Sequence, residues 1–276
     1  MRTALLLAAT AALVLAAGAA CAASVEVKDA VARVTVIPEA RSDVKVEVIQ
    51  ANGKLPLEVR TFGGQTIVDG HLGHRIRDCH GNGENVSVRV RDVGDVAWKD
   101  MPQVVIHTPR DVDVDAGGAV WGSVGRSASV KLGNAGCGDW TVGNTDGAMR
   151  ISQAGSGDTR TGSAGETSIR VAGSGNTTTG DIKGDLKVTI AGSGDVAVAS
   201  LAGPMDVHVS GSGDVKIAAG RATSMTVGIA GSGNVDFRGS ADTLKAHIAG
   251  SGDVRAKQVT GSVSKMVVGS GGVTIG

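Results

Sequence analysis

Bulky aromatic side chains are almost missing from this chain, which has three tryptophans, two phenylalanines and no tyrosine in 276 residues. Large globular cores draw much of their buried area from such side chains. A core here must be built from Val, Ile, Leu and Ala. That composition suits thin, regular layers better than one large globule.

An excess of charge is also missing, because 27 Lys and Arg residues balance 27 Asp and Glu residues. Proteins that bind nucleic acids carry a basic surplus clustered on one face. We therefore expect no nucleic-acid partner.

Catalytic signatures are absent as well. The chain has no Gly-x-Ser-x-Gly elbow, no His-Glu-x-x-His and no Gly-x-x-x-x-Gly-Lys phosphate loop, the patterns that place nucleophiles, metals or phosphates in many enzymes. We expect no catalytic residues, no cofactor and no metal.

The one long apolar run lies at the N-terminus, where Met1-Arg2-Thr3 precedes an Ala/Leu/Val stretch that ends near Ala20. A basic start, an apolar core and small residues are typical of a secretory signal peptide. A membrane span fits less well, because the run is rich in small residues and ends without flanking charges. We expect residues 1–22 to be removed. The mature chain would then have no transmembrane segment and would lie in the periplasm or at the cell surface or outer membrane.

Cys21 gives an alternative at the cleavage site. The segment Ala20-Cys21-Ala22 fits a small-x-small site, whereas an acylated Cys21 would make the protein a lipoprotein. A lipobox usually has Leu or another branched aliphatic residue three positions before the cysteine, and here Gly18 stands there. The sequence therefore favours the soluble form.

Glycine, by contrast, is abundant, with 43 residues. A Gly-Ser-Gly-Asp/Asn motif recurs every 18 to 20 residues, and its copies begin at Gly136, Gly155, Gly173, Gly192, Gly211, Gly231, Gly250 and Gly269. An eroded copy at Gly117 brings the array to about eight coils. A fixed period of this length is typical of a solenoid.

Apolar residues alternate within each repeat, as they do in strands. Between Gly192 and Ser210 they are Val196, Val198, Leu201, Met205, Val207 and Val209. We expect these side chains to point inward and stack on their equivalents in neighbouring coils. The sequence thus predicts an all-β fold, a single-stranded parallel β-helix or β-solenoid with coils of about 19 residues.

The residue after each Gly-Ser-Gly or Gly-Cys-Gly falls in one column and is Asp or Asn in every copy but the last, where it is Gly272. Glycines allow positive φ at a tight turn, and Asp or Asn side chains bond to nearby backbone N–H groups. We predict a structural turn ladder made of Asp139, Asp158, Asn176, Asp195, Asp214, Asn234 and Asp253. Calcium is the alternative explanation, but calcium-binding rolls use Gly-Gly-x-Gly-x-Asp with a nine-residue period.

Two further positions carry expectations about the coils. Trp121 and Trp140 are nineteen residues apart, which predicts that both stack in the inward column of Val196. The alternative is that the two tryptophans form a sugar-binding platform. Lys265 falls at an inward position, so the last coil is expected to be distorted or frayed. The outward columns repeat no single chemistry.

Residues 23–115 precede the glycine-rich repeats of residues 116–276 and form a β-rich region. Alternating stretches such as Val31–Ile37 and Val44–Ile49 predict strands with charged faces. We expect this region to cap the solenoid and to form one continuous domain with it, because an uncovered end invites edge pairing.

The segment from Asp69 to His80 contains the densest set of potential ligands, His71, His74, Cys79 and His80. Its glycines predict a loop. Histidines three apart on a loop lack the fixed spacing of a helical metal motif. We therefore expect a polar surface loop without a metal.

Cys79 and Cys137 are the two cysteines beyond the predicted signal peptide. Thiols tend to pair in an oxidising compartment. A disulfide between them would tie the β-rich region to the early coils, with an entropic gain of about 4 kcal/mol. The alternative is two separate buried thiols.

The chain resembles the bacterial "putative auto-transporter adhesin, head GIN domain" family in three features taken together. They are the Gly-Ser-Gly-Asp/Asn-Val units, the β-rich region that ends in Pro102–Arg110, and the signal peptide. The resemblance covers nearly all of the mature chain. It implies an extracytoplasmic right-handed β-helix-like domain with an adhesin role, and it supplies no catalytic or ligand residues.

We therefore expect an exported, adhesin-like binding or cell-envelope structural module without catalysis, whose partner is an envelope or surface ligand, either a glycan or a protein. One alternative is a polysaccharide-active β-helix enzyme, which would bring Asp, Arg and Lys together in a cleft. The other is a calcium-stabilised β-roll. The binding surface is expected in the outward columns or in the His71–His80 segment.

Overall fold

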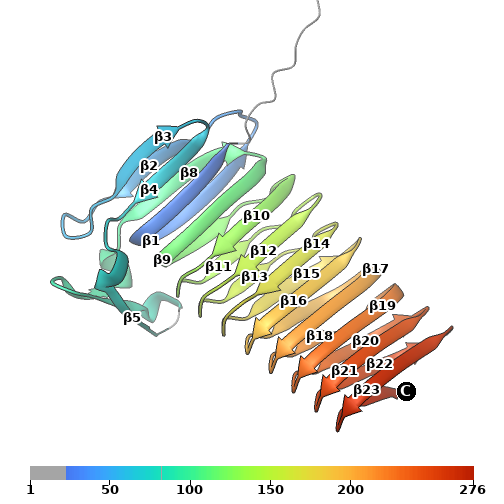
Figure 1. The fold of residues 1–276 in the computed structure, drawn as a ribbon. Coiled ribbons are helices and arrows are strands. Elements are labelled where there is room, and N and C mark those ends of the chain that lie inside the picture. The colour runs from blue at the N-terminus through green and yellow to red at the C-terminus, as the bar shows by residue number, and fades with distance from the viewer. Residues whose placement is uncertain (1–22, 82) are drawn as a thin grey trace, which may run out of the picture.

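The computed structural model describes residues 23–81 and 83–276, so the predicted signal peptide and Cys21 lie outside the described residues. The fold is all-β, with 67% strand and 4% helix, and most of it is a parallel β-solenoid of about nine turns with coils about 19 residues apart (Figure 1). The predicted fold class is confirmed. No helix among the described residues is long and apolar enough to cross a membrane.

The solenoid, here called the rod, consists of β1 and all strands from β9 onward. Its N-terminal and central strands are β1 (Ser24–Glu39), β9 (Asp111–Val124), β10 (Ser129–Asn134), β11 (Trp140–Val142), β12 (Met149–Gln153), β13 (Thr159–Thr161), β14 (Thr167–Val171), β15 (Thr177–Ile182) and β16 (Leu186–Gly192). The remaining strands are β17 (Val196–Gly211), β18 (Val215–Ile217), β19 (Gly220–Gly231), β20 (Val235–Ala241), β21 (Leu244–Gly250), β22 (Asp253–Val259), β23 (Val263–Gly269) and β24 (Gly272–Ile275).

Each coil places two strands on two faces of the rod. The first face carries β10, β12, β14 and β16, then the second half of β17, and then β19, β21 and β23, all in parallel register. The second face carries β11, β13, β15, the first half of β17, and then β18, β20, β22 and β24. The Gly-Ser-Gly corner joins the two faces.

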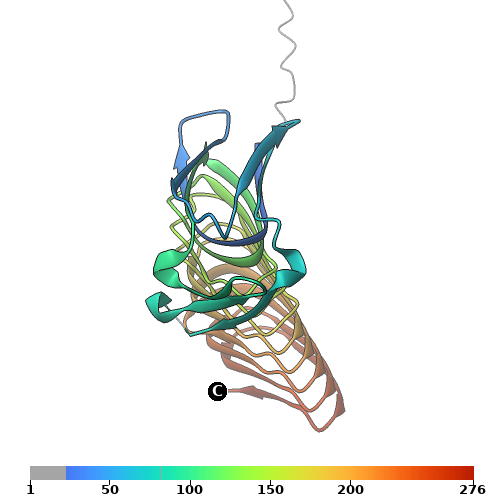
Figure 2. The same ribbon diagram turned by 90° about the vertical axis from the view of Figure 1, so that its left-hand side faces the viewer.

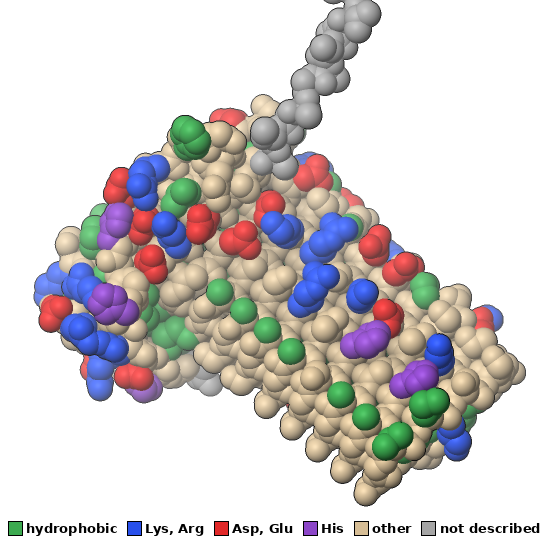
Figure 3. Space-filling view, viewed as in Figure 1, with side chains coloured by type: hydrophobic (Ala, Val, Ile, Leu, Met, Phe, Trp, Pro, Cys, Tyr) green, Lys and Arg blue, Asp and Glu red, His purple; other side chains and the backbone are tan. Residues whose placement is uncertain are grey.

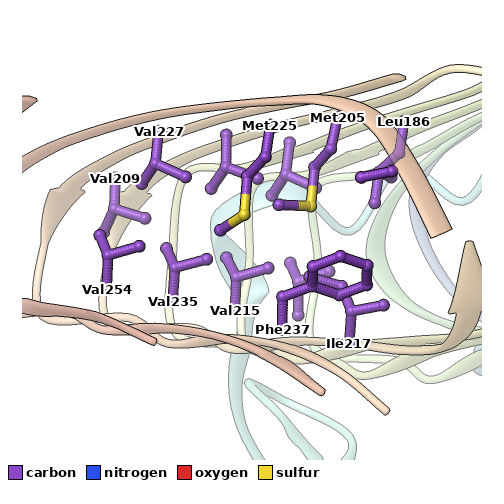
Figure 4. Close-up of a cluster of buried hydrophobic side chains, with 14 of the residues drawn as sticks. Leu186, Met205, Val209, Val215, Ile217, Met225, Val227, Val235, Phe237 and Val254 are labelled. Carbon is purple, nitrogen blue, oxygen red and sulfur yellow. The ribbon is translucent and has the colours of Figure 1, made fainter. Parts of the chain in front are cut away.

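The inward columns predicted from the repeat form the core. Val196, Val215, Val235 and Val254 lie in register on the second face and are buried. Figure 4 shows Leu186, Met205 and Met225 of the first face pointing into the same core, opposite Val215, Val235 and Val254. Because strand residues alternate between faces, every second side chain enters this core.

The corner needs glycine because the coils approach each other closely there. A Cβ atom on Gly211 would overlap the carbonyl oxygen of Gly192 in the preceding coil, and the same overlap recurs from coil to coil. Gly192 and Gly211 also have positive φ, 156° and 132°, a conformation that glycine adopts at no steric cost.

The early coils differ from the prediction in two ways: the corner glycine lies one residue later, and the array has one more turn. Gly118, not Gly117, is the corner glycine, because it lies under Gly136 and has a φ of 102°. The first coil is formed by β1, which pairs along its length with β9. The array therefore has about nine turns rather than about eight.

The shift also corrects the prediction for the tryptophans. Trp140 is buried in the inward column, where its register partner is Gly122. Trp121 precedes Gly122 by one residue, so its side chain lies on the outer side of the rod. There the apolar residues of the cap cover it, and 6% of its surface is exposed. The spacing is 18 residues at this coil, and a one-residue offset turns a strand side chain to the opposite face.

The prediction for the last coil is also wrong. β23 keeps an unbroken register with β21, and Lys265 lies opposite Ala246 in that register. Its side chain is exposed, because no described coil stacks on this side of β23. The inward position thus holds a charged residue without distorting the coil.

The cap, which we define as residues 45–109, comprises β2 (Lys45–Gln50), β3 (Glu58–Phe62), β4 (Gln65–Asp69), β5 (Ile76–His80), β6 (Ser87–Val90), β7 (Gly94–Ala97) and β8 (Gln103–Pro109). Its short 3-10 helices are η1 (Gly73–Arg75), η2 (Gly83–Asn85) and η3 (Trp98–Asp100). β4 pairs in parallel with the first half of β1, and β8 pairs in parallel with its second half. β3 pairs antiparallel with β4, and β2 pairs antiparallel with β8.

The small sheet β5-β6-β7 lies apart from these hairpins, against the corner side of the first coils (Figure 2). Its apolar residues form one cluster with Trp121 and Ala119 of β9. This packing covers the outer surface of β9 that would otherwise face solvent.

Candidate functional site

The predicted turn ladder lies in one column, and its side chains bond across coils. Oδ1 of Asp139 accepts a hydrogen bond from the backbone N–H of Asp158 at 2.8 Å, and Oδ1 of Asp158 accepts one from that of Asn176 at 2.9 Å. The same bond links each later member to the next, through Asp195, Asp214, Asn234 and Asp253, and the ladder ends on Gly272. The ladder therefore satisfies backbone donors at each corner, a role that needs no ligand.

A metal would need several converging ligands. Among residues 23–81 and 83–276, no group of three or more His, Cys, Asp and Glu side chains is placed to hold a metal ion. The ladder carboxylates follow one another in single file, one per coil, so each meets a neighbour only above and below.

The segment Asp69–His80 is predicted to be a loop. This is wrong for its second part, because Ile76–His80 forms strand β5 and pairs antiparallel with β6. Its glycine-containing first part turns at His71, which has a φ of 51°. The His71 ring reaches Glu58 at 2.7 Å. Among the described residues, the side chains of this segment form no group of three or more that could hold a metal ion.

Cys79 of β5 and Cys137 at the first Gly-Ser-Gly-type corner are brought together in the structure as a disulfide, with Cα atoms 6.3 Å apart. The pair connects the small sheet of the cap to the rod across 58 residues of sequence. It lies beside the cluster that contains Trp98 and Trp121.

A pocket of about 550 Å³ opens beside this junction, between the second face of the rod and the cap. We call it the junction pocket. Its lining residues come from four successive coils and from η2, η3 and β8 of the cap: Arg33, Val34, Thr35, Gly83, Glu84, Trp98, Gln103, Trp121, Gly122, Ser123, Asp139, Thr141, Asp158 and Arg160. Its size is in the range of small-molecule sites.

Two outward columns of the rod form its floor. One column runs Arg33, Trp121, Asp139 and Asp158, and therefore contains the first two members of the turn ladder. The neighbouring column runs Thr35, Ser123, Thr141 and Arg160. Strand register thus places hydroxyl groups beside carboxylates and guanidinium groups.

The indole of Trp98 forms the wall at the cap side and packs on Trp121 of the floor. Trp98 and Trp121 meet edge to face with ring centroids 6.1 Å apart and an interplanar angle of 81°. The guanidinium carbon of Arg33 lies 5.3 Å from the Trp98 ring centroid, and Nη2 of Arg33 donates to Oε1 of Gln50 at 3.1 Å. Aromatic packing and a cation–π contact of this kind hold the wall in place.

The carboxylates of the floor retain an oxygen for other partners. Asp139 uses Oδ1 for the ladder, and Asp158 uses Oδ1 in the same way while its Oδ2 lies 3.9 Å from Arg160. Each carboxylate oxygen has two lone pairs, so the unused oxygens can accept from a ligand.

Sequence reasoning missed this pocket. Glu84 and Trp98 come from cap segments that share no repeat with Asp139, and the coil that contains Arg33 carries no Gly-Ser-Gly motif that would reveal its register. The position of Trp121 could have been found from the 18-residue spacing between Gly118 and Gly136, which puts it in the ladder column.

A second hollow lies on the first face, along the C-terminal coils. It has a volume of about 490 Å³, and its lining includes Ala191, His208, Gly228, His247 and Met266. Figure 3 shows a row of small hydrophobic side chains running along this face of the rod, beside histidine and basic side chains. It is an apolar surface strip, in contrast to the mixed polar and aromatic junction pocket.

The geometry defines a capped parallel β-solenoid with one mixed aromatic and polar pocket at the cap. Residues 182–276 match the model of a family described as "Putative auto-transporter adhesin, head GIN domain". The predicted resemblance is thus confirmed over these C-terminal coils, while the cap and the junction pocket lie before the matched residues. No curated protein matches the chain.

Proposed function

We propose that the protein is an exported, adhesin-like binding module without catalysis, which holds an envelope or surface ligand in the junction pocket. The observation that carries this proposal is the convergence of Trp98, Trp121, Asp139 and Arg160 around one hollow of about 550 Å³. The later ladder residues, from Asn176 to Asp253, make the same cross-coil bonds, but none of them lines this pocket. The family match supports a binding role.

The predicted signal peptide and the adhesin-like family match support a protein that works in the periplasm or at the cell surface. A pocket with a paired sheet as its floor is well suited to binding, because the groups of the floor are already in position before the ligand arrives. β13, β11, β9 and β1 form its floor through continuous parallel pairing. Little ordering of the floor is then required on binding.

The test measures binding of the labelled mature protein to bacterial cells and to isolated envelopes. We expect Trp98→Ala and Asp139→Asn each to weaken binding about tenfold, the effect of losing one good contact of about 1.4 kcal/mol. Asp195→Asn, in the same ladder but outside the pocket, is the matched control and should bind normally. Absence of binding by the wild-type protein, or equal binding by all variants, would overturn the proposal.

The alternative of a polysaccharide-active enzyme receives support from the same place, because Asp139, Asp158 and Arg160 converge there. Incubation with envelope polysaccharides separates the two functions. A steady release of new chain ends that Asp139→Asn abolishes would establish the enzyme. A stoichiometric binding signal without product supports the binding module.

A further inference from the structure

We infer that the ligand of the junction pocket is a short, uncharged oligosaccharide that lies along the axis of the rod. This inference rests on the proposed function and names the class of ligand for the same pocket. It follows from the shape of the floor, the balance of donors and acceptors, the charge of the lining and the pairing of the strands below.

The floor is elongated along the rod. Its residues come from β1, β9, β11 and β13, which are consecutive in the parallel stack of the second face. Four strands spaced about 4.8 Å apart span about 14 Å. A linear ligand of several similar units would meet the same pair of columns at each step.

The polar groups suit a ligand rich in hydroxyls. Thr35, Ser123 and Thr141 supply hydroxyl groups that donate and accept, Asp139 and Asp158 supply acceptors, and Arg33, Arg160 and Gln103 supply donors. A sugar hydroxyl also donates and accepts, so each can be satisfied on this floor. A wholly apolar ligand would leave these groups desolvated without partners, at a cost in affinity.

The charge of the lining argues against a polyanion. Three acidic side chains, Glu84, Asp139 and Asp158, stand against two basic ones, Arg33 and Arg160. A sulfated or phosphorylated chain would place its charges against these carboxylates, and like charges brought together in this way oppose binding. An uncharged ligand avoids the repulsion.

The strand pairing argues against an extended peptide. Peptides that bind sheets usually add a strand at an open edge, where main-chain hydrogen bonds supply affinity. Each floor strand already has a parallel partner on both sides: β1 has β8 and β9, β9 has β1 and β11, and β11 has β9 and β13. The ligand must therefore be recognised by side chains from above the sheet.

The indole of Trp98 completes the match. Trp98 is partly exposed at the wall, and an indole offers an apolar surface together with one N–H donor. Sugar rings have the same dual character, with C–H surfaces and hydroxyl edges. An aromatic wall beside a polar floor therefore matches the two sides of one sugar ring.

The test uses isolated envelopes treated in one of two ways before the binding assay. Mild periodate cleaves vicinal diols of glycans, whereas a broad protease removes protein ligands. We expect periodate to abolish binding of the wild-type protein, protease to leave it intact, and an excess of heparin, a polyanion, not to compete. Binding that survives periodate, is lost with protease or is displaced by heparin overturns this inference while leaving a binding function in place.

A matched pair of variants locates the effect. Thr141→Val removes one floor hydroxyl at nearly constant volume, and Thr178→Val makes the same change two coils further along the same column, outside the pocket. We expect Thr141→Val to weaken envelope binding about three- to tenfold, the range for one lost hydrogen bond, with an unchanged melting temperature. Thr178→Val should match the wild type. Equal binding by both variants overturns the inference.

Untreated envelopes distinguish the two proposals. If the wild-type protein fails to bind any untreated envelope, the proposed function itself fails, and the ligand class fails with it. If it binds and Trp98→Ala weakens binding about tenfold while Asp195→Asn does not, the junction pocket stands as the site, and the two treatments then decide the ligand class.

Discussion

In the rod, each side chain meets its own equivalents in the coils above and below, whereas in the cap each strand meets a different partner. Val215 of the rod lies between Val196 and Val235, and all three are buried. In the cap, β3 pairs only with β4, and all five of its residues are exposed. Repetition therefore gives the rod a continuous core, while the cap depends on a few specific contacts.

This difference explains where the pocket lies. Along the rod, the ladder residues are occupied by bonds to the next coil, and the outward columns change from coil to coil. Only at the cap do η2 and η3 bring Glu84 and Trp98 over two such columns. A regular scaffold thus supplies the floor, and an irregular element supplies the wall.

The two phenylalanines of the chain give the sharpest test of this comparison. Phe237 is fully buried in the rod, at 0% exposure, whereas Phe62 at the end of β3 is 89% exposed. We expect Phe237→Ala to lower the free energy of unfolding by about 3–5 kcal/mol and Phe62→Ala to change it by less than about 0.5 kcal/mol. Chemical denaturation followed by circular dichroism measures both. Similar losses for the two variants would contradict the assignment of the core.

The disulfide tests whether the cap needs a covalent tie that the rod does not. We propose that Cys79 and Cys137 are oxidised in the exported protein, so that intact protein should show no reactive thiol at either position. The double variant Cys79→Ser with Cys137→Ser should lose up to about 4 kcal/mol of stability in the chain-entropy model. Because the bond joins β5 to the rod, the loss should appear first in the cap. Faster proteolysis between residues 70 and 100, with the rod intact, would be the readout.

Equal protection of the cap in the double variant and the wild type would contradict this proposal. Labelling of free thiols without reductant provides the control, because it reports oxidation independently of stability. Full labelling of Cys79 and Cys137 in protein isolated from the periplasm would mean that the two thiols remain separate.

Glycines give a third comparison of the two regions. A methyl group on Gly194 would overlap the carbonyl oxygen of Gly175 in the preceding coil, whereas one on Gly53 in the cap would meet nothing within 4 Å. The added methyl group of Gly194→Ala would overlap a backbone atom, so no flexible side chain can move aside to relieve the overlap. We expect Gly194→Ala to cost about 3 kcal/mol and Gly53→Ala to cost much less. Thermal melting of the two variants measures the difference, and equal melting temperatures would show that the coils can separate at the corner.

Much of the rod could be predicted from the sequence, because its order is local and periodic. The 18- to 20-residue spacing of the Gly-Ser-Gly motif fixes which residues share a column, and alternation fixes which of them point inward. The errors came from the first coils: Gly117 and Trp121 were placed one residue out of register because the motif is eroded there. One residue is enough to move Trp121 from the core to the outer surface.

The cap could not be predicted to the same degree, since its contacts join segments far apart in the sequence. Trp98 meets Trp121, and Arg33 meets Trp98, across 23 and 65 residues without any repeat to relate them. The junction pocket depends on these contacts. Strand alternation in the cap was recognisable, but the strand β5 was mistaken for a loop because glycines precede it.

The pH dependence of stability gives the last and smallest contrast, between Asp214 in the ladder and Asp69 in the cap. Burial raises the pKa of Asp214, but hydrogen bonds from Asn234 and the charge of Lys216 outweigh it, so that the net pKa lies below the ordinary value of 3.8. Burial likewise raises the pKa of Asp69, and the bond from the His71 N–H with the charges of His71 and Lys28 lowers it below 3.8. Both carboxylates therefore stabilise the fold above about pH 4 and lose that contribution as the pH falls through their folded pKa values.

Asparagine should replace Asp214 more easily than Asp69, because Asn176 and Asn234 already occupy ladder positions and accept the same cross-coil bond. Asp69 is 7% exposed and pairs with Lys28 at 3.5 Å and Arg60 at 3.1 Å, contacts that a neutral amide cannot replace. We expect Asp214→Asn to cost less than about 1 kcal/mol at pH 7 and Asp69→Asn to cost more. Each variant should also lose less stability than the wild type between pH 5 and 2. Denaturant midpoints across this range measure both effects, and an acid limb identical to that of the wild type would mean that the replaced carboxylate does not contribute.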